Sequence, residues 1–114
     1  MPKTEHELLL ETLHYNPETG EWHWLKQTSS RSLVGQKTGN VGTNSRTGIQ
    51  RRYVRFNGKL HLASRLAWFY MTGEWPNMTI DHINRDSLDD RWINLRDVSY
   101  SAQNFNRARP RRRA

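Results

Sequence analysis

The stretch Asp81-His82-Ile83-Asn84-Arg85-Asp86 and the Asn94-Leu95-Arg96 that follows it carry the strongest fold signal in the chain. They predict a short strand over residues 78–80 that runs into Asp81-His82, and a polar loop over 84–91. A second short strand follows over residues 95–98. A unit of this size cannot bury enough apolar surface alone, so it must pack on the chain that precedes it.

A third element completes this unit. Ser99 or Ser101 can cap a helix that runs to about residue 108 and contains the amide-rich Gln103-Asn104-Phe105-Asn106. Strand, loop, strand and helix then follow one another within one compact segment.

The residues before this unit predict a helix and a half-buried strand. Thr4 and Glu7 have the spacing of a capping box, which predicts a helix over residues 5–14. A turn is expected over residues 16–20. Residues 21–25 then alternate in polarity, so we expect a strand with its two Trp side chains on one face.

The middle of the chain predicts loops, a hairpin and a second helix. Residues 28–48 are rich in Ser, Thr, Gly and Asn, and we expect loops there with one short strand. Residues 51–56 form the best strand pattern, and Asn57-Gly58 turns the chain into residues 59–62. Residues 63–72 have helical spacing and end at Gly73.

The register of the hairpin stays open between two alternatives. A two-residue turn puts Phe56 opposite Lys59, whereas a three-residue loop puts Phe56 opposite Leu60 and keeps the apolar faces together. In either case Val54 and Phe56 share one face of the strand. The other face is basic and aromatic, with the side chains of Arg51, Tyr53 and Arg55.

Composition favours a small intracellular domain with a polyanionic partner. The chain has 114 residues, 34% of them hydrophobic, and a formal net charge of +7. It has no Cys, which excludes disulfides, thiol nucleophiles and Cys-type structural zinc sites. No apolar run is long enough to cross a bilayer and the start lacks a signal-peptide pattern, so we expect a cytoplasmic protein.

The positive charge is concentrated at the end of the chain. Five of the eighteen basic residues lie in the last eight positions: Arg107, Arg109, Arg111, Arg112 and Arg113. Such a tail is either a solvated, disordered end or an arm that neutralises phosphates and adds salt-dependent affinity.

Asp81 and His82 together offer the chemistry of phosphodiester hydrolysis. Adjacent side chains on a strand leave opposite faces, so a bulge or a strand end is needed for both to reach one cleft. Asp81 and an amide oxygen from the following helix would hold a hard cation such as Mg²⁺. His82 would then act as the general base that activates water.

This segment resembles the HNH (ββα-metal) endonucleases, especially the small phage-encoded and homing type. The resemblance also includes residues 15–20, 65–68 and 72–76 upstream. It implies an α+β fold: an N-terminal helix, antiparallel strands and a helix packed on a C-terminal ββα-metal motif. It also implies a divalent-metal-dependent DNA endonuclease, with one Mg²⁺ or Mn²⁺ per site and double-stranded DNA as partner.

The resemblance assigns roles to individual residues. His82 would be the base, Asn94 would orient it and brace the loop, and Asp81 with a helix amide would bind the metal. Residues 1–108 would form one domain, with a scaffold and DNA-binding part over 1–76 and the ββα-metal motif over 77–108. Residues 109–114 would be the basic tail. We expect a monomer whose DNA-binding residues are Arg51, Tyr53, Arg55, Arg107, Arg109, Arg111, Arg112 and Arg113.

Three positions depart from the family pattern. The family register puts the helix amide at Gln103, whereas the family's residue type stands one further on, at Asn104. Ser64 stands where many relatives have His, so any contribution of that His is missing unless His61 substitutes for it. Asp90 replaces a usual Asn and is expected to matter little, because either residue can cap a turn. The first two departures also suit a second class of function, a catalytically weakened or inactive HNH scaffold that binds DNA or regulates.

Overall fold

Over the residues that the structure describes, the protein is a small α+β domain with two α-helices and antiparallel sheets, and the expected fold class is confirmed at that level. The structure, a computed structural model, describes residues 2–30, 32–77 and 79–98. The predicted helix over residues 99–108 and the tail over 109–114 lie outside these residues. None of the described helices is long and apolar enough to cross a membrane.

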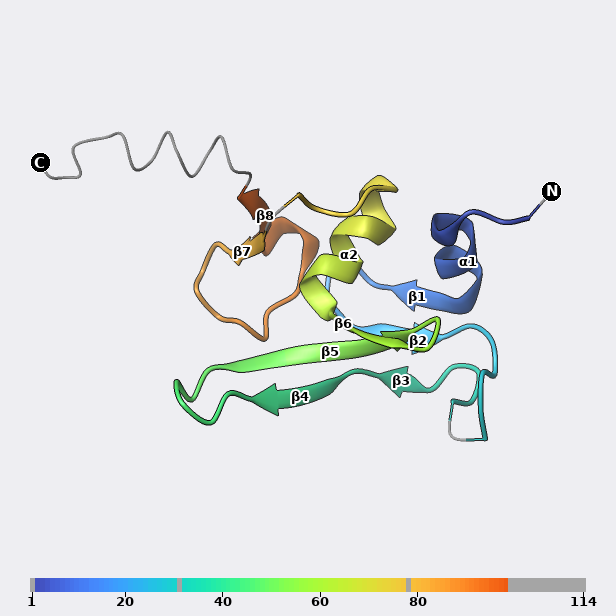
Figure 1. The fold of residues 1–114 in the computed structure, drawn as a ribbon, viewed down its shortest axis with the longest axis horizontal. Coiled ribbons are helices and arrows are strands. Elements are labelled where there is room, and N and C mark those ends of the chain that lie inside the picture. Colours follow the sequence, from blue (N-terminus) through green and yellow to red (C-terminus); the bar gives the residue numbers. More distant parts are fainter. Residues whose placement is uncertain (1, 31, 78, 99–114) are drawn as a thin grey trace, which may run out of the picture.

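The strands of the described ranges form three antiparallel sheets (Figure 1). The first contains β1 (Leu13–Tyr15), β2 (Trp22–Trp24) and β3 (Lys37–Thr38). The second contains β4 (Asn40–Thr43), β5 (Gln50–Phe56) and β6 (Lys59–Leu62). The third is the pair β7 (Thr79–His82) and β8 (Leu95–Val98), which are separated by a loop and the short 3₁₀-helix η1 (Trp92–Asn94).

The first helix, α1 (Glu5–Thr12), begins at the predicted capping box but ends earlier than predicted. The Thr4 hydroxyl accepts from the Glu7 N–H at 3.1 Å, and the Glu7 carboxylate accepts from the Thr4 N–H at 2.9 Å. The predicted helical end at residue 14 is wrong. Leu13 and Tyr15 are buried in β1 and pair with Trp24 and Trp22, so tertiary pairing overrides local helical spacing.

Residues 28–48 contain two short strands, β3 and β4, where we expected one. β4 pairs with β5 through backbone hydrogen bonds, and its side chains are mostly exposed. It therefore needs no alternation of apolar and polar residues, and that alternation is the pattern by which a strand is predicted from sequence.

The hairpin between β5 and β6 has the two-residue turn. Asn57 and Gly58 both have positive φ, of 53° and 80°, as a type I′ turn requires. Phe56 therefore lies opposite Lys59. As a consequence His61, opposite Val54, is on the inner face of the hairpin, whereas Leu60 is exposed.

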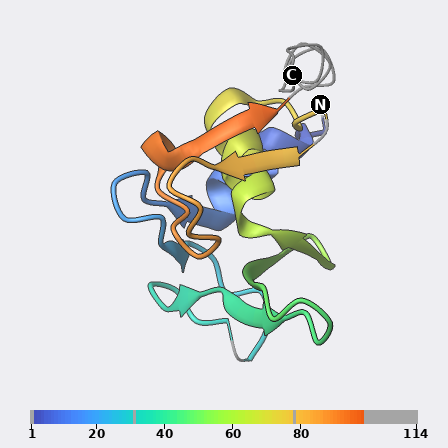
Figure 2. The ribbon, with the colours of Figure 1, turned by 90° about the vertical axis from the view of Figure 1, so that its left-hand side faces the viewer.

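The second helix, α2 (Ala63–Thr72), joins the parts of the molecule. It has the predicted bounds and ends at Gly73, whose φ of 82° few other residues adopt readily. It contacts β5, β6 and β7, and it lies between the β7–β8 hairpin and the second sheet (Figures 1 and 2). The hydrophobic core gathers around it, and its largest fully buried members are Leu9, Leu13, Tyr15, Trp22, Val54, Phe56 and Leu66.

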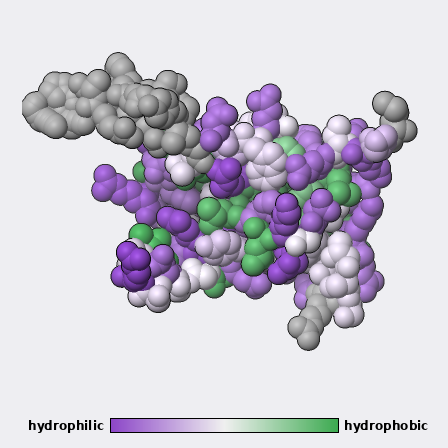
Figure 3. Space-filling model, in the orientation of Figure 1, coloured by the Kyte–Doolittle hydropathy of each residue, from purple (hydrophilic) through white to green (hydrophobic). Residues whose placement is uncertain are grey.

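The surface of the domain is predominantly polar. In Figure 3 apolar side chains form small groups among hydrophilic ones on the face that is shown. Inside, aromatic rings pack on one another among aliphatic side chains, for example Tyr15 and Trp22 with centroids 4.9 Å apart.

Candidate active site

The β7–β8 hairpin places His82 at the end of a regular strand. β7 and β8 pair without a bulge from Thr79 opposite Val98 to His82 opposite Leu95. The Ile83 N–H donates to the Asn94 carbonyl at 2.8 Å and closes the loop, and Arg85, with φ of 67°, turns the chain away. This is the strand-end geometry that lets neighbouring side chains approach one cleft.

Asn94 holds the loop together from inside. It is buried, and its side-chain oxygen accepts from the Asn84 N–H at 2.9 Å. Its amide nitrogen donates to the Asn84 side-chain oxygen at 3.0 Å and to the Asp89 carbonyl at 2.8 Å. Asn94 thus joins both arms of the loop that follows His82.

We expect Asn94→Ala to destabilise the protein by about 1–3 kcal/mol, because it leaves the Asn84 N–H and the Asp89 carbonyl without their partner. Denaturant unfolding followed by tryptophan fluorescence measures this difference. Asn57→Gly serves as the control, since it changes an Asn at a turn position with positive φ and should be close to neutral. A midpoint for Asn94→Ala equal to that of the parent contradicts the bracing role.

Two carboxylates of the loop, those of Asp86 and Asp89, bind groups within the loop itself. Asp86 Oδ1 accepts from the Leu88 N–H at 3.0 Å. Asp89 accepts two hydrogen bonds from the Arg91 guanidinium, each at 2.8 Å, and these hold its pKa at about 2. Both carboxylates therefore have structural partners within the loop.

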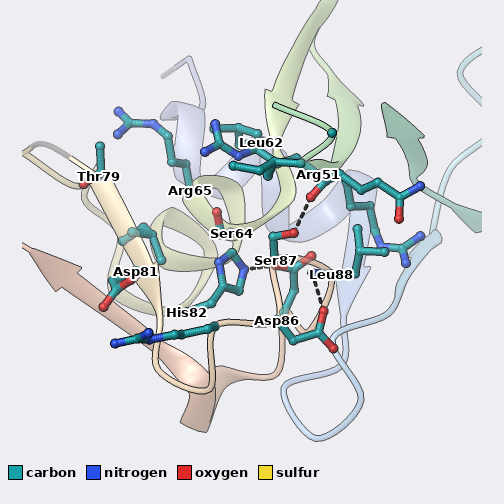
Figure 4. A pocket seen from close by; sticks show the side chains of 17 residues that line it. Arg51, Leu62, Ser64, Arg65, Thr79, Asp81, His82, Asp86, Ser87 and Leu88 are labelled. Atoms are coloured by element: carbon teal, nitrogen blue, oxygen red, sulfur yellow. Dashed lines mark hydrogen bonds and ion pairs between the residues drawn. The ribbon is translucent and has the colours of Figure 1, made fainter. Parts of the chain in front are cut away.

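A cavity of about 680 Å³ opens between β5, α2, β7 and this loop (Figure 4). Asp81 and His82 both line it. Ser87 of the loop, which also lines it, donates a hydrogen bond to the carbonyl of Gln50 at the start of β5. Four guanidinium side chains also line the cavity: Arg51, Arg52, Arg65 and Arg85. Three carboxylates, Asp81, Asp86 and Asp90, line it as well, so the arginines leave the lining with a small excess of positive charge that favours an anion.

Within this cavity His82 is held by a buried carboxylate. His82 Nε2 lies 2.8 Å from Asp90 Oδ1, and the side chains are only 14% and 2% exposed. The expected role of Asp90 as a turn cap is wrong, because its side chain contacts the candidate base His82 instead. The sequence pattern does not predict the contact between His82 and Asp90, because the contact depends on the path of the loop that separates them.

Asp81 leaves the strand in a different direction from His82. In Figure 4 the His82 ring points towards Ser64 on α2, whereas the Asp81 side chain points away from it. Asp81 Oδ2 accepts from Arg96 on the paired strand at 2.7 Å, and its side chain is 45% exposed. The carboxylate is thus accessible and held by one exposed ion pair, which contributes little stability.

The donor chemistry of Asp81 suits a hard divalent cation. Within residues 2–30, 32–77 and 79–98, no group of three or more His, Cys, Asp or Glu side chains could hold a metal. A metal site at Asp81 therefore needs a ligand from elsewhere. The amides considered for that role, Gln103, Asn104 and Asn106, lie outside the described residues.

His61 does not take the place of the His that Ser64 replaces. Ser64 is buried and lines the cavity. His61 instead stacks on Trp75, with ring centroids 5.1 Å apart and planes 20° apart, and is not among the residues that line the cavity. Burial lowers the pKa of His61, which favours a neutral ring in this stack.

The predicted DNA-binding face of β5 is only partly joined to the cavity. Arg51 lines both the cavity and a neighbouring hollow of about 260 Å³ that Tyr53 also lines. Arg55 lines a separate hollow beside Phe56 and Asn57. The remaining predicted DNA-binding residues, Arg107, Arg109, Arg111, Arg112 and Arg113, lie outside the described residues.

Fold and site together define a small α+β protein with a histidine and a carboxylate beside a basic cavity. Residues 61–104 match the family model of the HNH endonucleases, which confirms the resemblance to that family. The match begins in β6 and includes α2, β7, the loop and β8, and with them Asp81, His82 and Asn94. Searches of curated proteins and of solved structures give no match.

Proposed function

We propose that the protein is a divalent-metal-dependent endonuclease that hydrolyses phosphodiester bonds in double-stranded DNA. The observation that carries this proposal is the pair Asp81 and His82 at the edge of a cavity lined by four arginines, inside the segment that matches the HNH endonuclease family. Residues 77–108 would form the ββα-metal motif on the scaffold of residues 1–76.

His82 is the proposed general base. It lies in the cavity with one ring nitrogen bound to Asp90, so the other nitrogen can take a proton from water as that water attacks phosphorus. The bond from phosphorus to the leaving 3′ oxygen of the deoxyribose then breaks, and that oxygen takes a proton from water. The arginines of the cavity would bind the flanking phosphates.

Asp81 would hold the metal together with Asn104 or Gln103. We favour Asn104, because a shorter amide holds its oxygen with less conformational freedom, although the family register favours Gln103. When bound, Mg²⁺ or Mn²⁺ stabilises negative charge on the phosphate and on the leaving oxygen. Asp81 must exchange its contact with Arg96 for the metal, which an exposed ion pair permits at small cost.

A plasmid-nicking assay tests the proposed activity. Purified protein should convert supercoiled plasmid to nicked or linear forms with Mg²⁺ or Mn²⁺, and EDTA should stop the reaction. DNA binding without nicking under every metal condition would replace the proposal with the inactive DNA-binding scaffold, for which Ser64 is the structural argument.

The proposed path of the duplex leads from the cavity along the Arg51–Tyr53 face of β5. We expect Arg51→Ala to weaken binding to all DNA sequences alike and to lower the slope of log affinity against log salt by roughly 0.9, the value for one lost phosphate contact. Fluorescence anisotropy at several salt concentrations measures both quantities.

Lys26→Ala is the matched control for this experiment. It removes the same charge from an exposed side chain that binds Glu11 and lines none of these hollows. An equal change of slope in both variants would mean that net charge, and not a contact of Arg51, governs binding. The arginine tail can be tested in the same way by deletion of residues 109–114.

A further inference from the structure

Asp90 is a carboxylate in a place where a carboxylate is costly. Its side chain is 2% exposed, and its Oδ2 atom is buried without a hydrogen-bond partner among the described residues. Burial of a charged group without full pairing reduces stability. His82 is the side-chain partner of the other oxygen, Oδ1, at 2.8 Å. The contact that can compensate for this cost is therefore the one with His82.

The chemistry of the contact determines which ring nitrogen of His82 carries a proton. A carboxylate can only accept hydrogen bonds, so with Asp90 as the acceptor the Nε2–H of His82 would be the donor of this contact. In a neutral imidazole the other nitrogen, Nδ1, then has a free lone pair. Nδ1 is accordingly the atom that can take a proton.

The backbone of Asp90 is fixed by a segment far away in the sequence. The Tyr15 hydroxyl donates to the Asp90 carbonyl at 2.5 Å, and burial raises the pKa of Tyr15, so this donor stays protonated. The Trp92 N–H donates to the Pro17 carbonyl at 2.9 Å. A Cβ at Gly20 would lie 2.8 Å from the Asp90 carbonyl carbon, which shows how closely the two backbones approach.

We propose that Asp90 is a positioning residue that holds His82 by Nε2–H and leaves Nδ1 as the nitrogen that accepts the proton, with the turn at residues 15–20 as its support. This proposal rests on the proposed nuclease function only for its catalytic consequence. The tautomer and the orientation of His82 follow from the contact itself and can be measured in protein that has no metal and no DNA.

Asp90→Asn is the decisive variant because it keeps the size of the side chain and removes its charge. The amide can turn its oxygen or its nitrogen towards His82, and no partner from the described part of the chain at the Oδ2 position selects between the two. Asp89→Asn is the matched control. It removes the same charge from the neighbouring position, whose side chain binds Arg91 and Asn84 but not His82.

Two measurements distinguish the outcomes. Long-range ¹H–¹⁵N spectra of ¹⁵N-histidine-labelled, metal-free protein in alkaline buffer locate the ring proton of His82, whose signals are assigned with His82→Gln. We expect the proton on Nε2 in the parent and in Asp89→Asn, and a substantial fraction on Nδ1 in Asp90→Asn. Single-turnover nicking by Asp90→Asn should be slower by ~10–10²-fold, the range known for residues that orient a metal-binding histidine, with DNA affinity within about twofold of the parent.

A parent spectrum with the proton on Nδ1 overturns the proposal, even if Asp90→Asn does not fold. An unchanged proton position or a parental nicking rate in folded Asp90→Asn also overturns it. If the parent itself never nicks DNA, the proposed function fails, and the spectra still decide whether Asp90 positions His82.

Discussion

We expect the replacement of His82 with alanine to abolish nicking and to leave DNA affinity within a few-fold of that of the parent. A general base acts in the chemical step and contributes ~10²–10⁴-fold to the rate, so its loss appears in single-turnover nicking. The four arginines that line the cavity remain, and with them the electrostatic part of DNA binding.

The substitution leaves the buried Asp90 carboxylate without its side-chain partner and so lowers stability, and circular dichroism must show that the variant is folded. Among the described residues Asp90 is the side-chain partner of the His82 ring, and the backbone pairing of β7 with Leu95 is preserved by alanine. His14→Ala is the matched control, since His14 is an exposed histidine on β1 and lines none of the hollows described above. Single-turnover nicking by His82→Ala at the parental rate would remove His82 from the role of base.

The parts of the fold that follow from local rules could be predicted from sequence. Helix α2 has its predicted bounds because apolar spacing and the stop at Gly73 act within one turn of the chain. The β7–β8 hairpin is likewise where its pattern indicates. Helix α1 ends early because Leu13 and Tyr15 gain more from pairing with β2 than from another helical turn, a choice made by distant residues.

The candidate site likewise has features that could be predicted from the sequence and features that could not. The placement of His82 and Asn94 on one loop follows from their positions around two short strands. The contact of His82 with Asp90 could not be predicted, because it depends on a loop path that Tyr15 and Gly20 help to fix from the other end of the domain. The same is true of His61, whose place in the stack on Trp75 depends on the register of a two-residue turn.

Asp81→Ala should remove both metal binding and nicking. An amide alone is a poor ligand for a hard cation. Residues one step removed from a metal already change affinity by ~10–10²-fold, so we expect the loss of a carboxylate ligand to lower Mn²⁺ affinity by at least ~10²-fold. Isothermal titration calorimetry with Mn²⁺ measures this, and nicking should fall to the level seen with EDTA.

DNA binding separates this effect from a general loss of structure. Asp81 is an acidic side chain at the edge of a basic cavity, and its removal frees Arg96. Affinity for DNA in EDTA should therefore stay equal to that of the parent or rise, whereas unfolding would lower it. Asp89→Asn, whose side chain is bound to Arg91, should keep the parental Mn²⁺ affinity. If Asp81→Ala keeps that affinity and Asp89→Asn or Asp86→Asn loses it, the metal is bound by the loop and Asp81 serves only to pair with Arg96.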